Sequence, residues 1–561
     1  MFLYSSLTAP LLVSNHRNSA SLQSDSGRQK LLLWLTLLII AAGVFLRLYH
    51  FIDNRSLWRD ELYLAVSLIR MDFWELATQP LAYEQKAPVG YLWAVKLLVV
   101  LFGKGEMALR LFSLLTGIAT ILLFVPVTRF FLKPWAALLA LAMLAIGTPA
   151  VYHAVEAKQY GTELFASVLA LYLFIRFHRQ TDFVSLLQWG LAGATLLWFS
   201  YSAIFVLAGI ASAVCLHLLL QKEWHKMFRY ASSFTLWLIS FAAVYVLYLG
   251  RYQDSAWLTV FFKQFYDAYM PLPPASATDF QWFLHKAGSL LTHPLGQTVT
   301  LPGPFSLLTG PLRLVPLITL VAGVVLLLRK NSLPCTVLAF PVLLTLIASG
   351  LKLYPFHERF VLFLAPMLLL FIAYGAQAIS ALLADRAAVK LPLILLLMAP
   401  PAWNAARQAG NTDLFPKKEA NREALLYLNE SYSAGDAVYI YWNMWHAYAY
   451  YKEAYNLKFT ATGGKDLKTS SANQQTYFRK LSADFDNFQG HKRLWFLYHA
   501  HIKNNIGGFI GKPAWYFDKS FVPGQMLESA FSAYGEKTKQ RFDVKETVVS
   551  LYQLSPEKAP D

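Results

Sequence analysis

The segment LLLWLTLLIIAAGVFLRLYHF (residues 31–51) decides the fold class of this chain. It is apolar over roughly the 20 residues that a helix needs to cross the hydrocarbon core of a bilayer. It follows Arg28 and Lys30 and has no clear small-residue cleavage site, so we interpret it as an uncleaved signal anchor. Residues 1–30 are polar and Ser-rich, which predicts a disordered cytoplasmic N-terminus.

The composition agrees with a membrane protein. The chain has 561 residues, of which 56% are hydrophobic and 15% charged, whereas a soluble globular protein carries about 25% charged residues. The net charge of +16 lies mostly in short loops between apolar segments, where orientation in the bilayer explains it, so no nucleic-acid partner is predicted. Cys215 and Cys335 lie inside apolar stretches and imply no disulfide framework.

Ten further segments are predicted to span the membrane, giving about eleven transmembrane helices: Ala108–Phe130, Trp135–Tyr152, Tyr160–Phe177, Phe183–Phe199, Ala203–Leu220, Tyr230–Leu249, Phe305–Leu328, Leu333–Leu351, Phe360–Leu382 and Leu391–Trp403. Basic residues gather at every loop that this topology places inside, which is the positive-inside pattern: Arg28, Lys30, Arg129, Lys133, Arg176, Arg179, Lys222, Lys226, Arg229, Arg329, Lys330, Arg386 and Lys390. The pattern predicts that the loop 250–303 and the C-terminus lie outside.

The topology depends on the stretch from Pro88 to Gly103, which is apolar but short and contains Lys96. If it crossed the membrane, all later loops would invert and the basic loops would face outward. We therefore predict an interfacial or re-entrant helix there, within a large first outer loop, residues 52–107. The transmembrane domain is predicted to cover residues 31–405.

Beyond Trp403 the composition changes. Residues 411–561 are polar with short apolar runs. Residues 419–430 read as an amphipathic helix, and AVYIYW (437–442), LWFLY (494–498) and TVVSLY (547–552) read as strands. Helices and strands alternate, which predicts a small extracytoplasmic α/β domain.

Four polar clusters fall on the predicted outer face. The first is Asp60-Glu61, within SLWRDELY (56–63), and the second is YEQKAPVGY (83–91), followed by Arg110 at the start of the next span. The third is EAKQY (156–160) and the fourth is YPFHER (354–359). Taken singly, each has a structural explanation, because basic residues at helix ends snorkel and acidic residues complement the helix dipole. Four acid–base clusters on one face favour a functional site.

These clusters resemble the motifs of the GT-C superfamily of integral membrane glycosyltransferases. The chain is most similar to the protein O-mannosyltransferase-like branch, which includes the lipid A aminoarabinose transferase. That branch has an Asp-Glu pair after the first span, a Pro-containing Tyr-rich helix, an Arg at the second span and a Glu-Ala-Arg-x-Tyr-like motif at the fourth. The matching positions are Asp60-Glu61, Pro88 with Tyr91, Arg110 and residues 156–160. Lys158 replaces the usual Arg, and Gln85 and Ala87 separate residues that are contiguous in the aminoarabinose enzyme.

The resemblance implies a sugar donor linked to polyprenyl phosphate, and a glycan, lipid or protein acceptor. The leaving phosphate needs cations, and the acceptor hydroxyl needs a base. The expected catalytic residues are Asp60 as the base, with Glu61 and Glu156. The expected donor-phosphate residues are Lys86, Arg110, Lys158, Tyr160 and Arg359. Further substrate or metal contacts are expected from Glu84, His357 and Tyr354.

Metal dependence stays open at this stage. A divalent ion held by Glu84 with His285 or His293 is one hypothesis.

Two other classes of protein stay open as well. A transporter or flippase of a lipid-linked sugar is one, although the charges gather at one face rather than at mid-membrane. A non-catalytic receptor with an outer domain is the other. The favoured hypothesis is a glycosyltransferase of the plasma membrane, the inner membrane in a bacterium.

Overall fold

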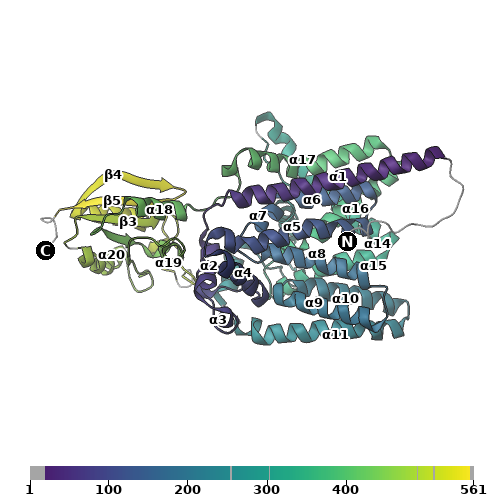
Figure 1. Cartoon of the computed structure of the whole chain (residues 1–561), viewed down its shortest axis with the longest axis horizontal. Helices are drawn as coiled ribbons and strands as arrows, with labels where there is room; N and C mark the ends of the chain where they lie inside the picture. Colours follow the sequence, from purple (N-terminus) through teal and green to yellow (C-terminus); the bar gives the residue numbers. More distant parts are fainter. Residues whose placement is uncertain (1–18, 253–255, 302, 489, 509–511, 556–561) are drawn as a thin grey trace.

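The computed structural model describes residues 19–252, 256–301, 303–488, 490–508 and 512–555. A helical bundle forms one end of an elongated molecule, and a small domain with a β-sheet forms the other (Figure 1). Between them lie α2 (Arg59–Arg70), α3 (Phe73–Thr78) and α4 (Val89–Phe102). The predicted polytopic helical fold with a C-terminal α/β domain is confirmed.

Nine helices in the described part of the chain are long and apolar enough to cross a membrane. They are α1 (Ser19–Ile52), α5 (Glu106–Phe131), α8 (Tyr160–Phe177), α10 (Ala203–Leu220), α11 (Trp224–Leu247), α14 (Thr309–Lys330) with the preceding η3 (Gly303–Leu308), α15 (Ser332–Gly350), α16 (Ala365–Leu382) with the preceding η4 (Glu358–Leu364), and α17 (Ala387–Gly410). The predicted span at Phe183–Phe199 is α9, a shorter apolar helix of 17 residues.

The predicted span from Trp135 to Tyr152 is not one straight helix. It consists of α6 (Pro134–Ile146) and α7 (Thr148–Ala154), which are bent by 50° at a short break. Pro149 lies in the first turn of α7, where a missing backbone N–H donor is tolerated. Because proline disrupts a helix interior, α6 does not continue through Pro149. If the pair is counted as one broken span, the described part of the chain has ten.

Close helix contacts in the bundle depend on small residues. Where α14 meets α16, a Cβ on Gly323 would lie 2.0 Å from the Phe371 carbonyl oxygen, and one on Gly375 would lie 1.8 Å from that of Thr319. No side chain fits at either position, so the two glycines let the backbones touch. Small residues serve this purpose in membrane helices, because apolar lipid supplies no hydrophobic drive for association.

The short helices at the outer end of the bundle do not fit a spanning role. The 14 residues of α4 are too few to cross the hydrocarbon, and the helix buries one face through Tyr91, Val95 and Val99. Lys96 donates to the Leu68 carbonyl oxygen of α2 at 3.1 Å instead of facing lipid. Two more helices from the loop 250–303 cover this end: α12 (Ala256–Tyr266) and α13 (Ala277–Thr292).

The C-terminal sheet has five strands in the order β2-β1-β3-β5-β4. The predicted strands are β1 (Ala437–Ile440), β3 (Arg493–His499) and β5 (Thr547–Leu554), and the predicted helix is α18 (Asn421–Ser431). Two strands were not predicted: β2 (Thr462–Gly463) and the polar β4 (Gly535–Val544). Strand β4 pairs antiparallel with β5. Helices α19 (Trp445–Ala454), α20 (Gln474–Ser482), α21 (Ala514–Phe517) and α22 (Pro523–Tyr534) accompany the sheet.

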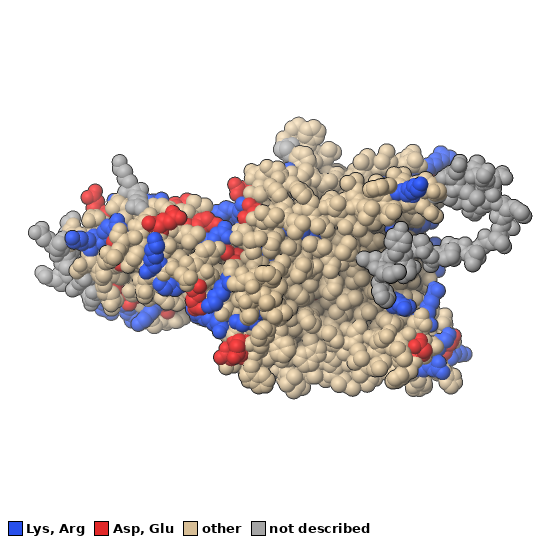
Figure 2. Space-filling model, in the orientation of Figure 1, with Lys and Arg blue, Asp and Glu red and all other residues tan. Residues whose placement is uncertain are grey.

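Charge is distributed unevenly over the surface. Figure 2 shows Lys, Arg, Asp and Glu on the sheet domain, at its junction with the bundle and at the opposite end of the bundle. The surface between these regions is nearly free of charge on the visible face. Such a band matches the requirement that a protein surface in lipid be apolar.

Candidate active site

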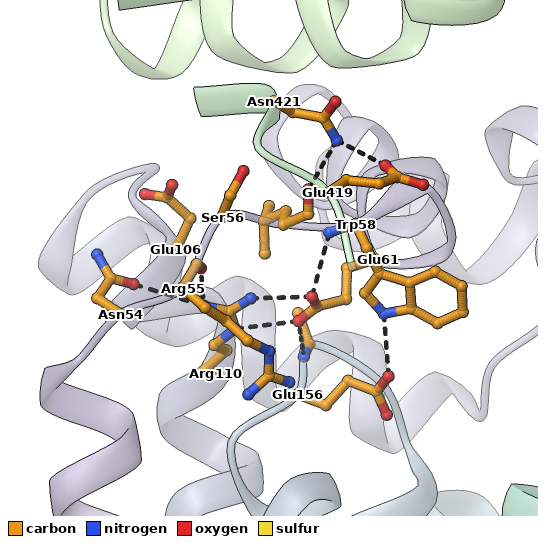
Figure 3. Close-up of polar contacts among 12 residues, drawn as sticks. Asn54, Arg55, Ser56, Trp58, Glu61, Glu106, Arg110, Glu156, Glu419 and Asn421 are labelled. Carbon is orange, nitrogen blue, oxygen red and sulfur yellow. Dashed lines mark hydrogen bonds and ion pairs between the residues drawn. The ribbon is translucent and has the colours of Figure 1, made fainter. Parts of the chain in front are cut away.

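The candidate site is built around the start of α2, directly after the first span. The backbone N–H of Arg59 donates to the Glu419 carboxylate at 2.9 Å, so a residue more than 350 positions away satisfies a free donor at this helix end. Asn421 holds the same carboxylate at 2.7 Å and also donates to the Leu57 carbonyl oxygen at 3.0 Å (Figure 3). The segment that leads into the sheet domain therefore fixes the first turn of α2.

Asp60 lies in this first turn, between two cations. Lys158 Nζ is 3.1 Å from its Oδ1, and Arg359 Nη1 is 3.3 Å from its Oδ2. Its side chain keeps 20% of its surface exposed, whereas that of Lys158 is buried. Burial by itself would raise the pKa of Asp60, but the charges of Lys158 and Arg359 outweigh burial and lower it. Asp60 is therefore an accessible carboxylate that is ionised at neutral pH.

Glu61 faces away from Asp60 and forms a buried clamp with Arg110. Arg110 Nε and Nη2 donate to the two carboxylate oxygens of Glu61 at 3.0 and 2.9 Å (Figure 3). The Arg110 Nη1 donates to the Arg55 carbonyl oxygen at 2.6 Å, and the Ala157 N–H donates to Glu61 at 2.8 Å. The clamp joins α2 to α5 and to the turn between α7 and α8.

Glu156 lies in that turn and is fully buried. It accepts a hydrogen bond from Trp58 Nε1 at 3.1 Å (Figure 3). Its other oxygen lies 2.6 Å from His153 Nδ1. The second nitrogen of His153 lies 2.9 Å from Nε2 of His293. This chain of contacts orients the indole of Trp58, which forms part of the wall beside Asp60.

A cavity of about 380 Å³ opens next to Asp60. Its walls come from four parts of the chain: α2, the segment 83–85, α12 and the start of η4, closed by the loop 504–506 of the sheet domain. The lining combines the charged Asp60 and Arg359 with the aromatic side chains of α12, namely Trp257, Phe261, Phe262, Phe265 and Tyr266. Charged and apolar groups in one lining suit an amphiphilic substrate.

A cavity of similar size, about 400 Å³, opens between other helices of the bundle. Its lining includes His178, Arg179, His217 and Lys226, near the basic loops, and contains no carboxylate. It therefore lacks the carboxylate that borders the first cavity.

The chain was compared with known protein families, proteins and solved structures. Residues 86–248 match the profile of the dolichyl-phosphate-mannose-protein mannosyltransferase family. No curated protein matches the chain. The crystal structure of ArnT from Cupriavidus metallidurans bound to undecaprenyl phosphate is similar with a TM-score of 0.50 and 12% identity, over 92% of this chain and 97% of that chain. The protein has the GT-C glycosyltransferase fold.

Two further structures agree. ArnT of the same organism in the apo state has a TM-score of 0.51 at 11% identity, over 94% of this chain and 98% of that chain. The apo oligosaccharyltransferase of Archaeoglobus fulgidus has a TM-score of 0.50 at 13% identity, over 94% and 75%. The GT-C resemblance expected from the motifs is confirmed, and the ArnT-like branch fits. The family match and the shared GT-C fold indicate a membrane glycosyltransferase.

Several predicted site residues line the pocket beside Asp60 or support its walls. His357 lines the pocket and lies against Tyr266, with ring centroids 4.5 Å apart. Tyr160 lies 5.5 Å from the guanidinium carbon of Arg359, measured to its ring centroid, and so helps to place that cation. Tyr354 lies outside the lining, and its hydroxyl donates to the Phe360 carbonyl oxygen at 2.8 Å.

Lys86 is half-buried in a neighbouring cavity of about 360 Å³. That cavity shares the lining residues Glu84, Gln85 and Trp257 with the pocket beside Asp60. The side-chain oxygen of Gln85 accepts a hydrogen bond from the Lys158 ammonium at 2.5 Å. Lys86 therefore lies beside the pocket, one residue from a partner of Lys158.

The metal hypothesis does not match the observed contacts. The Glu84 carboxylate accepts from Trp257 Nε1 at 2.7 Å, His293 contacts His153, and His285 is exposed on α13. Glu84 and His293 thus contact other partners, and His285 faces the surface. Among the described residues, no group of three or more His, Cys, Asp or Glu side chains is arranged to hold a metal ion.

Sequence reasoning missed the contribution of the segment before the sheet domain. Lys418 Nζ lies 3.3 Å from the ring centroid of Trp58, on the indole that Glu156 orients. Burial lowers the pKa of Lys418, and the nearby Glu156 opposes that effect. The run Lys417-Lys418-Glu419 after Pro416 was the available signal, but its distance along the chain from Asp60 concealed its role.

Proposed function

We propose that this protein transfers a sugar from a polyprenyl-phosphate donor to an acceptor hydroxyl on the outer face of the membrane. The observation that carries the proposal is the partly exposed carboxylate of Asp60, held between Lys158 and Arg359 at the wall of a pocket that also has aromatic lining. The solved structure of ArnT with undecaprenyl phosphate supports this donor class, because that protein shares the fold.

The proposed reaction is a single displacement. The acceptor oxygen attacks the anomeric carbon, and Asp60 takes the hydroxyl proton as general base. The bond between that carbon and the phosphate oxygen breaks, and its electron pair leaves with the phosphate. Arg359, which lines the pocket, stabilises the charge on the departing phosphate, and Lys158, which is buried and does not line the pocket, holds Asp60 in place. No general acid is needed because this leaving group is already an anion.

The geometry redistributes some of the expected roles. Arg110 is buried and engaged by Glu61, so we assign it a positioning role instead of a phosphate contact. Glu156 contacts Trp58 and His153 and does not line the pocket, so it too positions the site. Lys86 remains a candidate phosphate ligand from the adjoining cavity.

We further propose that the sheet domain and the pocket lie outside the cytoplasm, with the N-terminus inside, in the plasma membrane or a bacterial inner membrane. The basic residues at the far end of the bundle support this orientation (Figure 2).

Sugar transfer by the purified protein tests the proposal. A radiolabelled polyprenyl-phosphate sugar is incubated in detergent with envelope lipids of the producing cells, and transfer is scored by extraction. We expect label in the acceptor fraction, and a lipid-linked sugar that co-purifies and is identified by mass spectrometry. Movement of the intact donor across a reconstituted bilayer without transfer would instead identify a flippase.

A further inference from the structure

A smaller cavity, of about 170 Å³, lies where the sheet domain meets α2. Tyr63 and Tyr83 come from the bundle side, and the sheet domain supplies the rest of the lining: Trp442, Asn443, Trp445, His446, Gly464, Asp466, Ile502 and Asn505. Tyr63, Tyr83 and Asn505 also line the pocket beside Asp60, so the two cavities share a wall. We call this smaller cavity the junction pocket.

The junction pocket has the chemistry of a sugar site. A sugar ring has C–H faces and a rim of hydroxyl groups, so it needs aromatic surfaces together with neutral hydrogen-bonding groups. Four of the lining residues are Tyr or Trp, whose rings combine an apolar face with a polar edge. The volume is below the roughly 300–1,000 Å³ of pockets for drug-sized ligands, which suits one sugar ring rather than a long chain.

The aromatic walls are already in place. Tyr63 and Tyr83 stack with centroids 4.6 Å apart, and His446 meets the edge of Tyr63 at 5.1 Å. Trp445 packs on Gly463, where a Cβ would lie 2.8 Å from the indole ring, so only glycine admits the ring there. Trp445 keeps 37% of its surface exposed.

The polar groups are also held in position. Asn443 donates to the carbonyl oxygens of His499 and Ile502 at 2.8 and 2.9 Å, and Asp466 forms an ion pair with the buried Lys468. His446 is buried, and its Nε2 has no hydrogen-bond partner within the described part of the chain. Burial, together with the nearby positive charge of Arg59, lowers the pKa of His446 to about 3, so the imidazole is neutral and able to donate or accept.

The junction pocket is aligned with the proposed base. Asp60 and Tyr63 are three residues apart on α2 and therefore share one face of the helix, with a rise of about 4.5 Å between them. A group that rests on Tyr63 lies one turn from the Asp60 carboxylate. An acceptor bound there presents its hydroxyl from the side of the sheet domain, opposite the aromatic surface of α12.

We propose that the junction pocket binds a neutral sugar unit of the acceptor, so that the acceptor is a glycan or glycolipid and the sheet domain determines acceptor choice. This inference rests on the proposed function and specifies its acceptor class. It assigns Trp445 as the stacking surface and His446 as a hydroxyl ligand.

Separate kinetics for donor and acceptor test the proposal. Trp445→Ala should raise KM for the envelope glycolipid acceptor by roughly three- to tenfold, the size of one aromatic contact, with KM for the donor unchanged. Trp445→Phe should keep KM for the acceptor close to the wild-type value. His446→Phe should raise KM for the acceptor while keeping an aromatic ring in the core. Phe478→Ala, a half-buried aromatic of the same domain outside the junction pocket, is the matched control and should leave both values unchanged.

A binding measurement gives a result independent of turnover. Quenching of tryptophan fluorescence by maltose and N,N′-diacetylchitobiose is titrated with the full-length protein in detergent. Saturable quenching by either sugar that Trp445→Ala abolishes supports the junction pocket. Absence of binding by both sugars, or equal binding by Trp445→Ala, overturns it. Absence of transfer by the wild type contradicts the proposed function instead, and sugar binding then decides the junction pocket alone.

Discussion

Asp60 and its two cations define the site at the scale of single residues. The carboxylate is partly exposed, ionised and bordered by the charged groups of Lys158 and Arg359. Removing its charge while keeping its size therefore separates base catalysis from packing.

Asp60→Asn should lower turnover by about 10²–10⁴-fold, the usual contribution of a general base, with donor affinity largely retained. The measurement is the initial rate of transfer, with thermal unfolding as a check on folding. Asp182→Asn is the control, because Asp182 caps α9 and Asn caps helices equally well. Near-normal turnover of Asp60→Asn would move the base elsewhere.

The pH profile of kcat/KM tests the ion pair with Lys158. Because the pKa of Asp60 is lowered in the folded protein, activity that needs the carboxylate is present above that pKa and is lost as the pH falls through it. Lys158→Gln removes a charge that lowers the pKa, so the acid limb of the profile should move to higher pH. Lys226→Gln, at an exposed ion pair with Glu223, should leave the limb in place, and an unmoved limb in Lys158→Gln would contradict the assignment.

At the scale of elements, the orientation of α2 depends on contacts far away in sequence. The Glu61–Arg110 clamp joins it to α5, and the segment before α18 holds its first turn through Glu419 and Asn421. These contacts hold Asp60 at the pocket although α2 has only 12 residues.

Glu61→Gln should destabilise the protein by about 3–5 kcal/mol, because it leaves the buried guanidinium of Arg110 without a counter-charge. Equilibrium unfolding in mixed micelles measures this loss. Arg70→Gln breaks an exposed pair with Glu453 and should cost only about 0–1 kcal/mol. Equal effects of the two substitutions would show that the buried clamp contributes little to stability.

At the scale of the whole molecule, the charge-free band separates two charged ends (Figure 2). The proposed orientation puts the sheet domain, the pocket and the junction pocket on the same side of the membrane. Because α4 is too short to cross the membrane, it does not invert the orientation of the later spans.

A reporter that is active only outside the cytoplasm, fused after Asp561, should therefore be active. The same reporter fused in the basic loop at Lys222 should be inactive, since that loop is predicted to lie inside. Activity of a cytoplasmic reporter at the C-terminus would reverse the topology and place the pocket on the wrong side for the proposed reaction.

Composition and periodicity alone determined the class of this protein, most of its spans and the strands β1, β3 and β5. These features follow from local rules: an apolar run long enough for a bilayer is a span wherever it occurs, and an alternating run bounded by turns is a strand. The predicted topology also placed Asp60, Lys158 and Arg359 on one face of the membrane, so that they formed one hypothesis before their contacts were known.

Only the tertiary structure showed the partners of neighbouring residues. Asp60 and Glu61 are adjacent and chemically alike, but successive residues on a helix point about 100° apart, so one meets the pocket and the other meets Arg110. Lys418 and the junction pocket depend on contacts across more than 350 residues, for which the sequence holds no local signal. Burial and partner choice, which decide the chemistry of each charged group, arise when distant segments pack together.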